Sequence, residues 1–181
     1  MNFQKTQENS SDLCHKLVAK FSNYFFLLFS LFFLFSTTSY AEDDKGKSLS
    51  DILELKEAPT GVVIEIVTWD GDNLNWALPR AQDHIKQLRE TFPKLPVAIV
   101  THGAEQFALT NDSKDENKKV HSLVQSLGEA DVQVHVCETF AGWRGLSADD
   151  FPSYVNVAAA GPAQVNDYLA LGYELIIITE E

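Results

Sequence analysis

One cysteine stands where a predicted strand gives way to a polar segment. Residues 131–146 read D-V-Q-V-H-V-C-E-T-F-A-G-W-R-G-L, and the apolar/polar alternation at their start ends at Cys137. This alternation has the period of a β-strand. In α/β proteins, ligands bind beyond the carboxyl ends of parallel strands. The position of Cys137 therefore makes its thiol the first candidate for chemistry.

Two basic side chains are candidates for supporting a thiolate at Cys137. The thiolate is the reactive form of cysteine, and a nearby cation favours it. Arg144 follows closely enough in sequence to fold back on the sulfur, although Glu138 adds an opposing charge. His102 ends another predicted strand at the same expected edge, where a Cys–His pair gives a thiolate at neutral pH. The alternatives are a cysteine that only packs and a histidine bonded to backbone.

Other polar residues share the predicted strand of Cys137. His135 and Gln133 lie on the same face as the cysteine, whereas a parallel strand covered on both faces is usually apolar throughout. This predicts either partial exposure of that face or a polar interface between subunits. Glu65, on the first predicted strand, is a candidate partner for His135.

Neither a metal site nor a cofactor is predicted. Among residues after 41, the four histidines show no ligand spacing on a shared helix, and one cysteine cannot form a thiolate cluster. The stretch W-D-G-D after the first predicted strand is acidic and lacks a glycine-rich phosphate pattern. No G-x-S-x-G hydrolase motif is present. The sequence leaves open whether the protein is an enzyme.

Residues 1–41 have the pattern of a secretory signal peptide. Lys16 and Lys20 precede a 12-residue apolar run over 24–35, the small residues of Ser39-Tyr40-Ala41 suit cleavage, and acidic residues follow. The run is shorter than the ~20 residues that a membrane span needs. We therefore expect a periplasmic or secreted protein with no stable membrane span after cleavage. The alternative is an uncleaved N-terminal anchor.

The chain expected after cleavage, residues 42–181, is strongly acidic. Cleavage removes three lysines and two acidic residues, which leaves 11 basic and 24 acidic residues and a net charge of −13. This charge argues against nucleic acid and anionic membrane surfaces as partners. Cys14 leaves with the signal peptide, so Cys137 is unpaired in an oxidising compartment, where structural cysteines usually pair. Such a thiol is a candidate for reactivity.

The remaining sequence predicts one α/β domain. Residues 42–60 are expected to form a flexible polar lead with one helical turn, and residues 61–181 the domain. Five apolar segments alternate with helical patterns through short connections, which predicts a three-layer α/β/α fold around a five-stranded, mainly parallel sheet. The predicted strands are 62–68, 96–101, 132–137, a weak one at 154–158, and 173–179.

Four short motifs follow one another along the predicted domain. They are A-I-V-T-H-G (98–103), V-H-V-C (134–137), W-R-G-L (143–146) and L-G-Y (171–173). The order of these parts resembles the DsrE family, small α/β proteins of sulfur metabolism. The ordered set of motifs is more specific than any one of them, and the likeness extends over residues 62–179.

The resemblance implies a fold that assembles into trimers or hexamers. In sulfur-relay members of the family, a cysteine that matches Cys137 carries a persulfide between partner proteins. Those members work in the cytoplasm, whereas this chain is expected to be exported. Our hypothesis is an exported, homo-oligomeric protein in which Cys137 accepts sulfur from a donor protein or acts as a redox thiol. The alternative is a non-catalytic oligomeric module for binding or assembly, in which Cys137 only packs.

Overall fold

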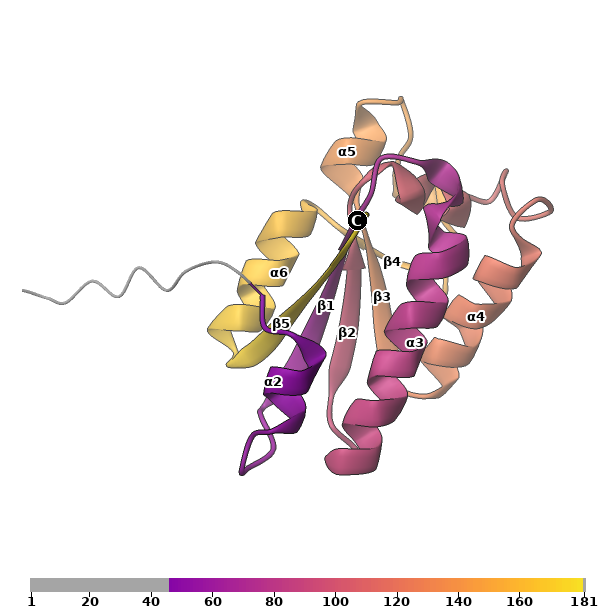
Figure 1. Cartoon of the computed structure of the whole chain (residues 1–181). Helices are drawn as coiled ribbons and strands as arrows, with labels where there is room; N and C mark the ends of the chain where they lie inside the picture. Colours follow the sequence, from indigo (N-terminus) through magenta and orange to yellow (C-terminus); the bar gives the residue numbers. More distant parts are fainter. Residues whose placement is uncertain (1–45, 181) are drawn as a thin grey trace, which may run out of the picture. The chain divides into compact units, whose positions relative to one another are not determined.

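Five parallel strands form one sheet in a computed structural model, which describes residues 46–180 (Figure 1). The strand order is β4-β3-β2-β1-β5, and each neighbouring pair runs parallel. The predicted sheet is therefore confirmed, and it is parallel throughout. The strands are β1 (Gly61–Val67), β2 (Val97–Thr101), β3 (Val132–Cys137), β4 (Asn156–Ala158) and β5 (Tyr173–Thr179).

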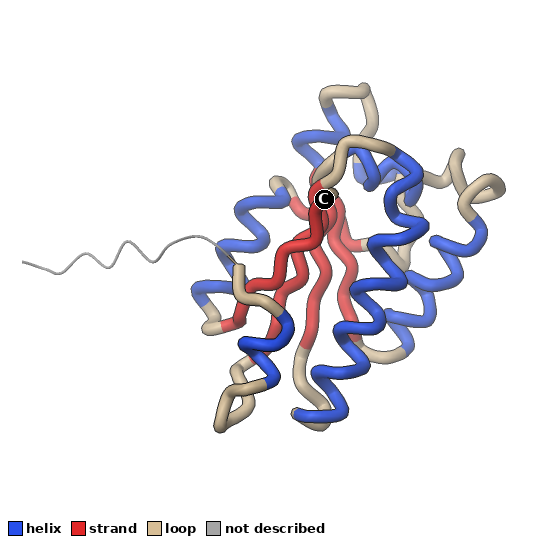
Figure 2. Tube along the Cα trace, in the orientation of Figure 1, coloured by secondary structure: helices blue, strands red, loops and turns tan. Residues whose placement is uncertain are grey.

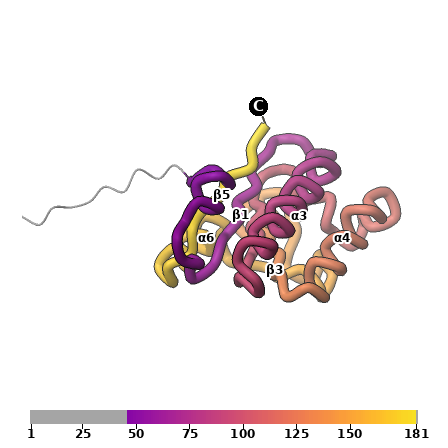
Figure 3. The backbone as a smooth tube through the Cα atoms, turned by 60° about the horizontal axis from the view of Figure 1, so that its bottom comes forward, coloured from indigo at the N-terminus to yellow at the C-terminus, as the bar shows by residue number. Residues whose placement is uncertain are grey.

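Helices cover both faces of this sheet, so the predicted three-layer α/β/α domain is confirmed. One face carries α2 (Leu49–Leu53), α3 (Leu74–Thr91) and α4 (Lys118–Glu129), and the other carries α6 (Gly161–Ala170) (Figures 2 and 3). A short helix, α5 (Glu138–Gly142), follows β3 at the carboxyl edge of the sheet. The 3-10 turns are η1 (Gly71–Asn73), η2 (Ala104–Leu109) and η3 (Ala148–Asp150).

The alternation of strand residues sorts them between two cores. Val62, Ile64 and Ile66 of β1 are fully buried against α2, α3 and α4. Val63 points the other way and joins a smaller core under α6, with Val165 among its members. Full burial of one such side chain stabilises the fold by about 1.5–3 kcal/mol. The larger core therefore contributes most of the apolar burial that stabilises the sheet. The smaller core covers only part of the α6 face, which also carries polar residues.

The described part of the expected lead is folded onto the domain. Ser48 caps α2 through a reciprocal pair of hydrogen bonds with Asp51. Ile52 of α2 is fully buried in the larger core, and the backbone N–H of Lys47 donates to the carbonyl of Leu175 on β5. The expected helical turn is thus present, and Leu49, Leu53 and Leu55 also pack against the larger core, which holds this segment on the domain. The expected signal peptide lies outside the described residues.

Two local sequence patterns differ from the structure. The apolar run L-I-I-I (175–178) is typical of a strand covered on both faces, yet β5 is an edge strand and Ile177 is 39% exposed. A glycine often follows the last residue of a helix, yet Gly128 lies inside the last turn of α4, and it is Asp131 that adopts the left-handed conformation beyond the helix, with a φ of 56°. Within residues 46–180, no helix is both long and apolar enough to cross a membrane.

Candidate functional site

Cys137 is the last residue of β3 and the residue that caps α5. Its Sγ accepts the backbone N–H of Phe140 at 3.4 Å. The side chain is only 4% exposed, so the chain beyond β3 folds back over the sulfur. The predicted strand end is confirmed. The sulfur is thus the side-chain acceptor that caps the first turn of α5.

His102 and Cys137 are both on the α6 face, at the carboxyl edge of the sheet. Thr101 of β2 and Val136 of β3 are the last residue pair between these strands, and His102 and Cys137 are the residues that directly follow them. Gly161, the first residue of α6, packs on the Cβ of His102. The structure thus places these two predicted site residues at the same edge and on the same face of the sheet.

The imidazole of His102 is bonded to a carboxylate on β1. Nε2 of His102 lies 2.7 Å from Oε1 of Glu65, and the two side chains are 14% and 16% exposed. This corrects the expected pairing of Glu65 with His135. Glu65 is opposite Val100, and Val100 is opposite His135, so the expected partners are two strands apart, about 10 Å. Alternation gives the face of a side chain but not its register.

Arg144 lies on an aromatic cluster above the carboxyl edge. Its Cζ is 4.0 Å from the centroid of the Phe107 ring, a cation–π contact. Phe107 contacts Phe140, which in turn meets Trp143 edge-on at 5.3 Å between centroids. Phe140 also supplies the N–H that reaches the sulfur of Cys137. Arg144 is therefore linked to the cysteine through two phenylalanines, and its described contact is with Phe107 rather than with the sulfur.

Gln106 was not predicted, and it holds the backbone of Cys137. The side chain of Gln106 is fully buried in η2, and its Oε1 accepts the backbone N–H of Cys137 at 2.7 Å. Its Nε2 has no hydrogen-bond partner among the described residues. A buried amide donor without a partner lowers the stability of the fold. The hydrogen bond from the Cys137 N–H to Oε1 is therefore the only polar contact of the Gln106 side chain that offsets this cost among the described residues. The one sequence signal is two polar residues within the otherwise apolar run A-E-Q-F-A-L.

Glu105 was also missed, and it joins the ends of β1 and β2. Its fully buried carboxylate accepts hydrogen bonds from the backbone N–H groups of Thr68 and Gly103 at 2.8 and 2.9 Å. The hydroxyls of Thr68 and Thr101 donate to it as well. A Cβ at Gly103 would lie 2.2 Å from the carbonyl oxygen of Thr68, so glycine is needed for this close approach. Residues 105 and 106 together tie three strand ends into one edge.

His135 takes part in a chain of hydrogen bonds under α6. The hydroxyl of Tyr168 donates to Oε1 of Gln133 at 3.1 Å, so Nε2 of His135, 2.9 Å away, donates to that hydroxyl. Burial lowers the pKa of His135 and raises the pKa of Tyr168, which keeps both groups neutral near pH 7. The predicted polar face of β3 is thus largely satisfied within the domain, although Gln133 itself is exposed.

The sequence profile of the DsrE/DsrF-like family matches residues 30–177, which is most of the chain. The chain belongs to this family. Among solved structures it is similar to MTH1491 from Methanobacterium thermoautotrophicum, described as a protein of unknown function, with 16% identity and a TM-score of 0.53. That match covers 65% of this chain and 99% of the other.

A second similar structure is the YchN protein from E. coli, which shares the fold of this DsrE-family chain. It has 17% identity and a TM-score of 0.50, and the match covers 66% of this chain and 99% of that protein. Likeness at these identities concerns the fold alone. No curated protein sequence matches the chain.

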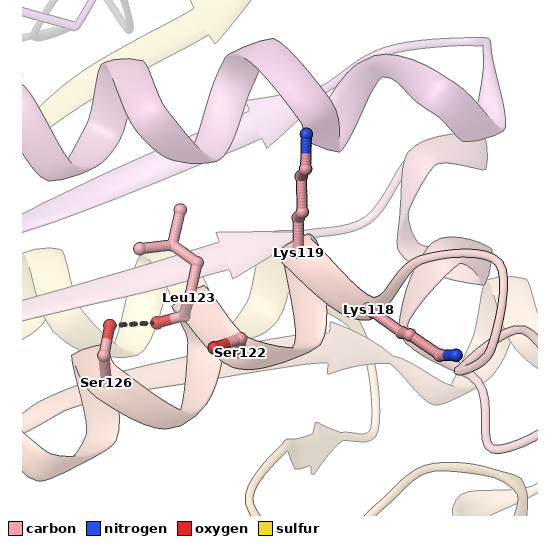
Figure 4. Close-up of a pocket in the computed structure, with 5 residues that line it drawn as sticks. All are labelled: Lys118, Lys119, Ser122, Leu123 and Ser126. Carbon is pink, nitrogen blue, oxygen red and sulfur yellow. Dashed lines mark hydrogen bonds between the residues drawn. The ribbon is translucent and has the colours of Figure 1, made fainter.

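Metal binding and surface pockets were the other two candidates for a functional site in this DsrE-family domain. Within residues 46–180, no group of three or more His, Cys, Asp or Glu side chains is arranged to hold a metal ion. A shallow surface pocket lies on α4, where Ser126 donates a hydrogen bond to the carbonyl of Leu123 (Figure 4). It is open to solvent and lined by one helix. Its lining residues are Lys118, Lys119, Ser122, Leu123 and Ser126.

Proposed function

We propose that this DsrE-family protein accepts sulfur on Cys137 as a persulfide, outside the cytoplasm. The observation that carries the proposal is that Cys137 and His102 directly follow Val136 and Thr101, the last residue pair between β3 and β2, on the α6 face of the sheet. The sulfur also accepts the backbone N–H of Phe140 at 3.4 Å. Family membership adds that relatives in sulfur relays use a cysteine at this position. The same thiol can act as a redox group, because persulfidation and oxidation both begin at a thiolate.

The proposed step needs no external oxidant. The thiolate of Cys137 attacks the terminal sulfur of a donor persulfide, R–S–SH, and a new S–S bond forms. The S–S bond of the donor breaks, and its electron pair leaves with the donor sulfur as RS⁻, which takes up a proton. The products are a Cys137 persulfide and the donor thiol. The donor is a protein or small thiol that carries a persulfide in the same compartment.

The test is mass spectrometry of protein isolated from its own cell envelope. We expect Cys137 to carry the mass of one additional sulfur atom, and we expect a reducing agent to remove it. The C137S variant, treated in the same way, is the matched control. Loading in vitro with a low-molecular-weight persulfide should give the same product. A native protein that never gains sulfur on Cys137, in the cell or in vitro, contradicts the proposal.

A second function is a non-catalytic module for binding or assembly. The burial of Cys137, only 4% exposed, favours it, because a small sulfur side chain packs well in a protein interior. The two functions differ in the reactivity of the native thiol. A working thiol is alkylated by iodoacetamide in the folded protein, whereas a packed one is alkylated only after unfolding.

We also propose that the protein is a homo-oligomer, a trimer or a hexamer. Large apolar side chains are exposed at several positions on the described domain, and a subunit interface would remove them from water. Trp69 and Trp143 are 75% and 76% exposed beyond the carboxyl edge, and Leu171 is 66% exposed after α6. Closed symmetry would bury the same patches on every copy. Light scattering that returns the mass of one chain at all concentrations contradicts this.

Export through a cleaved signal peptide completes the proposal, with the mature chain beginning at Glu42. The support is the sequence of residues 1–41, a short apolar run with a small-residue cleavage site. N-terminal sequencing of the exported protein should read from Glu42. A protein that still begins at Met1 would instead be anchored by its N-terminal segment.

A further inference from the structure

The α6 face of the sheet carries an acid, an imidazole and a thiol on three successive strands. Glu65 is on β1, His102 directly follows β2, and Cys137 ends β3. The carboxylate and the imidazole are in direct contact, 2.7 Å apart. The imidazole and the thiol belong to the residues that directly follow the last residue pair between β2 and β3, Thr101 and Val136. Across the sheet, the carboxylate, the imidazole and the thiol thus follow one another in the order in which an acid orients a base and the base activates a nucleophile.

We propose that Glu65 is a positioning residue that orients His102 for proton exchange with Cys137. This inference rests on the proposed sulfur transfer. Glu65 binds Nε2 of His102, so the carboxylate fixes the ring and leaves Nδ1 as the nitrogen that exchanges the proton. A third element restrains the imidazole, because a Cβ on Gly161 would lie 2.3 Å from the Cβ of His102.

The surroundings of the pair argue against a purely structural ion pair. Glu65 lies between Val100 and Ile177 in one row of the sheet, on the α6 face, where His135 and Tyr168 form a separate hydrogen-bonded pair. Removing a carboxylate and an imidazole from water is costly, and an apolar pair of similar volume usually stabilises a fold as well or better. A partly buried polar pair placed beside the single cysteine of the domain is therefore explained better by chemistry than by stability.

The pair completes the proton balance of sulfur transfer. His102 takes the proton of the Cys137 thiol, and the carboxylate of Glu65 stabilises the imidazolium that forms. The thiolate attacks the terminal sulfur of the donor persulfide, and the departing RS⁻ takes the proton from His102. The site returns to its starting protonation state with sulfur on Cys137.

The experiment is the pH dependence of iodoacetamide alkylation of Cys137 in the native protein. We compare the wild type with E65Q, H102Q and the double variant. At pH 7, each single variant should be alkylated about tenfold more slowly, the effect of one pH unit in thiolate formation. The double variant should be no slower than H102Q, because Glu65 acts through His102. The E65D variant should recover part of the rate.

The matched control is E174Q. Glu174 is on β5, and its Oε2 forms an ion pair with Nζ of Lys47 at 2.9 Å, which the substitution removes. It should leave the alkylation profile unchanged. Wild-type rates in E65Q, or multiplied losses in the double variant, overturn the inference. If circular dichroism shows that a variant is unfolded, the titration of the His102 ring is followed by NMR in folded E65D and in the wild type. Identical titration curves overturn the inference.

Sulfur loading separates this inference from the proposed function. If E65Q and H102Q load sulfur and are alkylated like the wild type, the inference fails and the function stands. If the wild type never loads sulfur but the three residues are coupled in alkylation, the function fails and the positioning role stands. A thiol that is alkylated only after unfolding overturns both.

Discussion

Glu105 is bound to Thr68 by two hydrogen bonds at the carboxyl edge of the sheet. Oε2 of the carboxylate accepts the backbone N–H of Thr68 at 2.8 Å and its hydroxyl at 2.9 Å. The other oxygen accepts the backbone N–H of Gly103. All of these groups are buried, so water cannot replace a lost partner. The edge that carries His102 and Cys137 therefore depends on a carboxylate that does no chemistry in the proposed reaction.

We predict that E105Q destabilises the protein by about 2–3 kcal/mol. The new NH₂ group would face hydrogen-bond donors, whichever way the amide turns, and at least one buried N–H would lose its acceptor. The measurement is urea unfolding at pH 7. E57Q makes the same change at an exposed position and should alter stability by less than about 0.5 kcal/mol. Equal unfolding midpoints for E105Q and E57Q would contradict the prediction.

The sequence predicted the strands better than the contacts between them. The boundaries of β3 follow from the alternation of Val132, Val134 and Val136, because a period of two specifies one buried face. The partner of Glu65 did not follow, since the choice between His102 and His135 depends on register across three strands. Periodicity carries no information of that kind.

Glu105 and Gln106 were missed for a related reason. A buried polar residue is recognised by its partners, and these come from strand ends that are far apart in sequence. Arg144 shows the converse. Its sequence distance from Cys137 allows a contact with the sulfur, whereas the contact that the structure shows is with the ring of Phe107, a residue far away in sequence.

Substitution of alanine for glycine should have opposite effects at two helical positions. In G161A, the new Cβ would lie 2.3 Å from the Cβ of His102, which cannot move away without shifting β2. We expect a loss of about 1–3 kcal/mol from overpacking. In G128A, nothing lies within 4 Å of the new Cβ, and we expect a gain of about 0.5–1 kcal/mol in α4. Thermal unfolding checks both signs, and a stabilised G161A would show that α6 does not press on His102.

Three histidines should make stability depend on pH below neutrality. Burial lowers the pKa of His84, His121 and His135 below the ordinary value of about 6.5. At His121, the carbonyl of Ala108 opposes this effect, whereas the charge of Lys114 reinforces it. Nδ1 of His121 also lies 2.6 Å from the hydroxyl of Tyr154. The folded protein thus binds these protons more weakly than the unfolded chain.

We predict that the free energy of unfolding falls as the pH drops from 7 towards 5.5. With a lowered folded pKa, the unfolded chain takes up protons first, so stability is complete above about 6.5 and is lost below it. Each histidine contributes a slope of at most about 1.4 kcal/mol per pH unit. Urea unfolding at several pH values measures the total, and H121Q and H135Q should each flatten the curve. A stability that rises on acidification would contradict the assigned direction.

The last prediction concerns the bond between Gln106 and the backbone of Cys137. In Q106M, a side chain of similar volume has no acceptor for the Cys137 N–H, which is buried and held at 2.7 Å in the wild type. We expect a loss of about 1–3 kcal/mol. We also expect faster hydrogen exchange at the Cys137 amide than at the other amides of β3, because only that group loses its partner. NMR-detected exchange makes the comparison within one molecule.

The control for Q106M is Q125M, the same substitution at an exposed position of α4. It should leave both the unfolding midpoint and the exchange of the Cys137 amide unchanged. If Q106M exchanges faster uniformly along β3, the effect is a general loss of stability, and Gln106 is a packing residue. If exchange is faster at Cys137 alone, Gln106 is the residue that fixes the backbone from which the thiol projects.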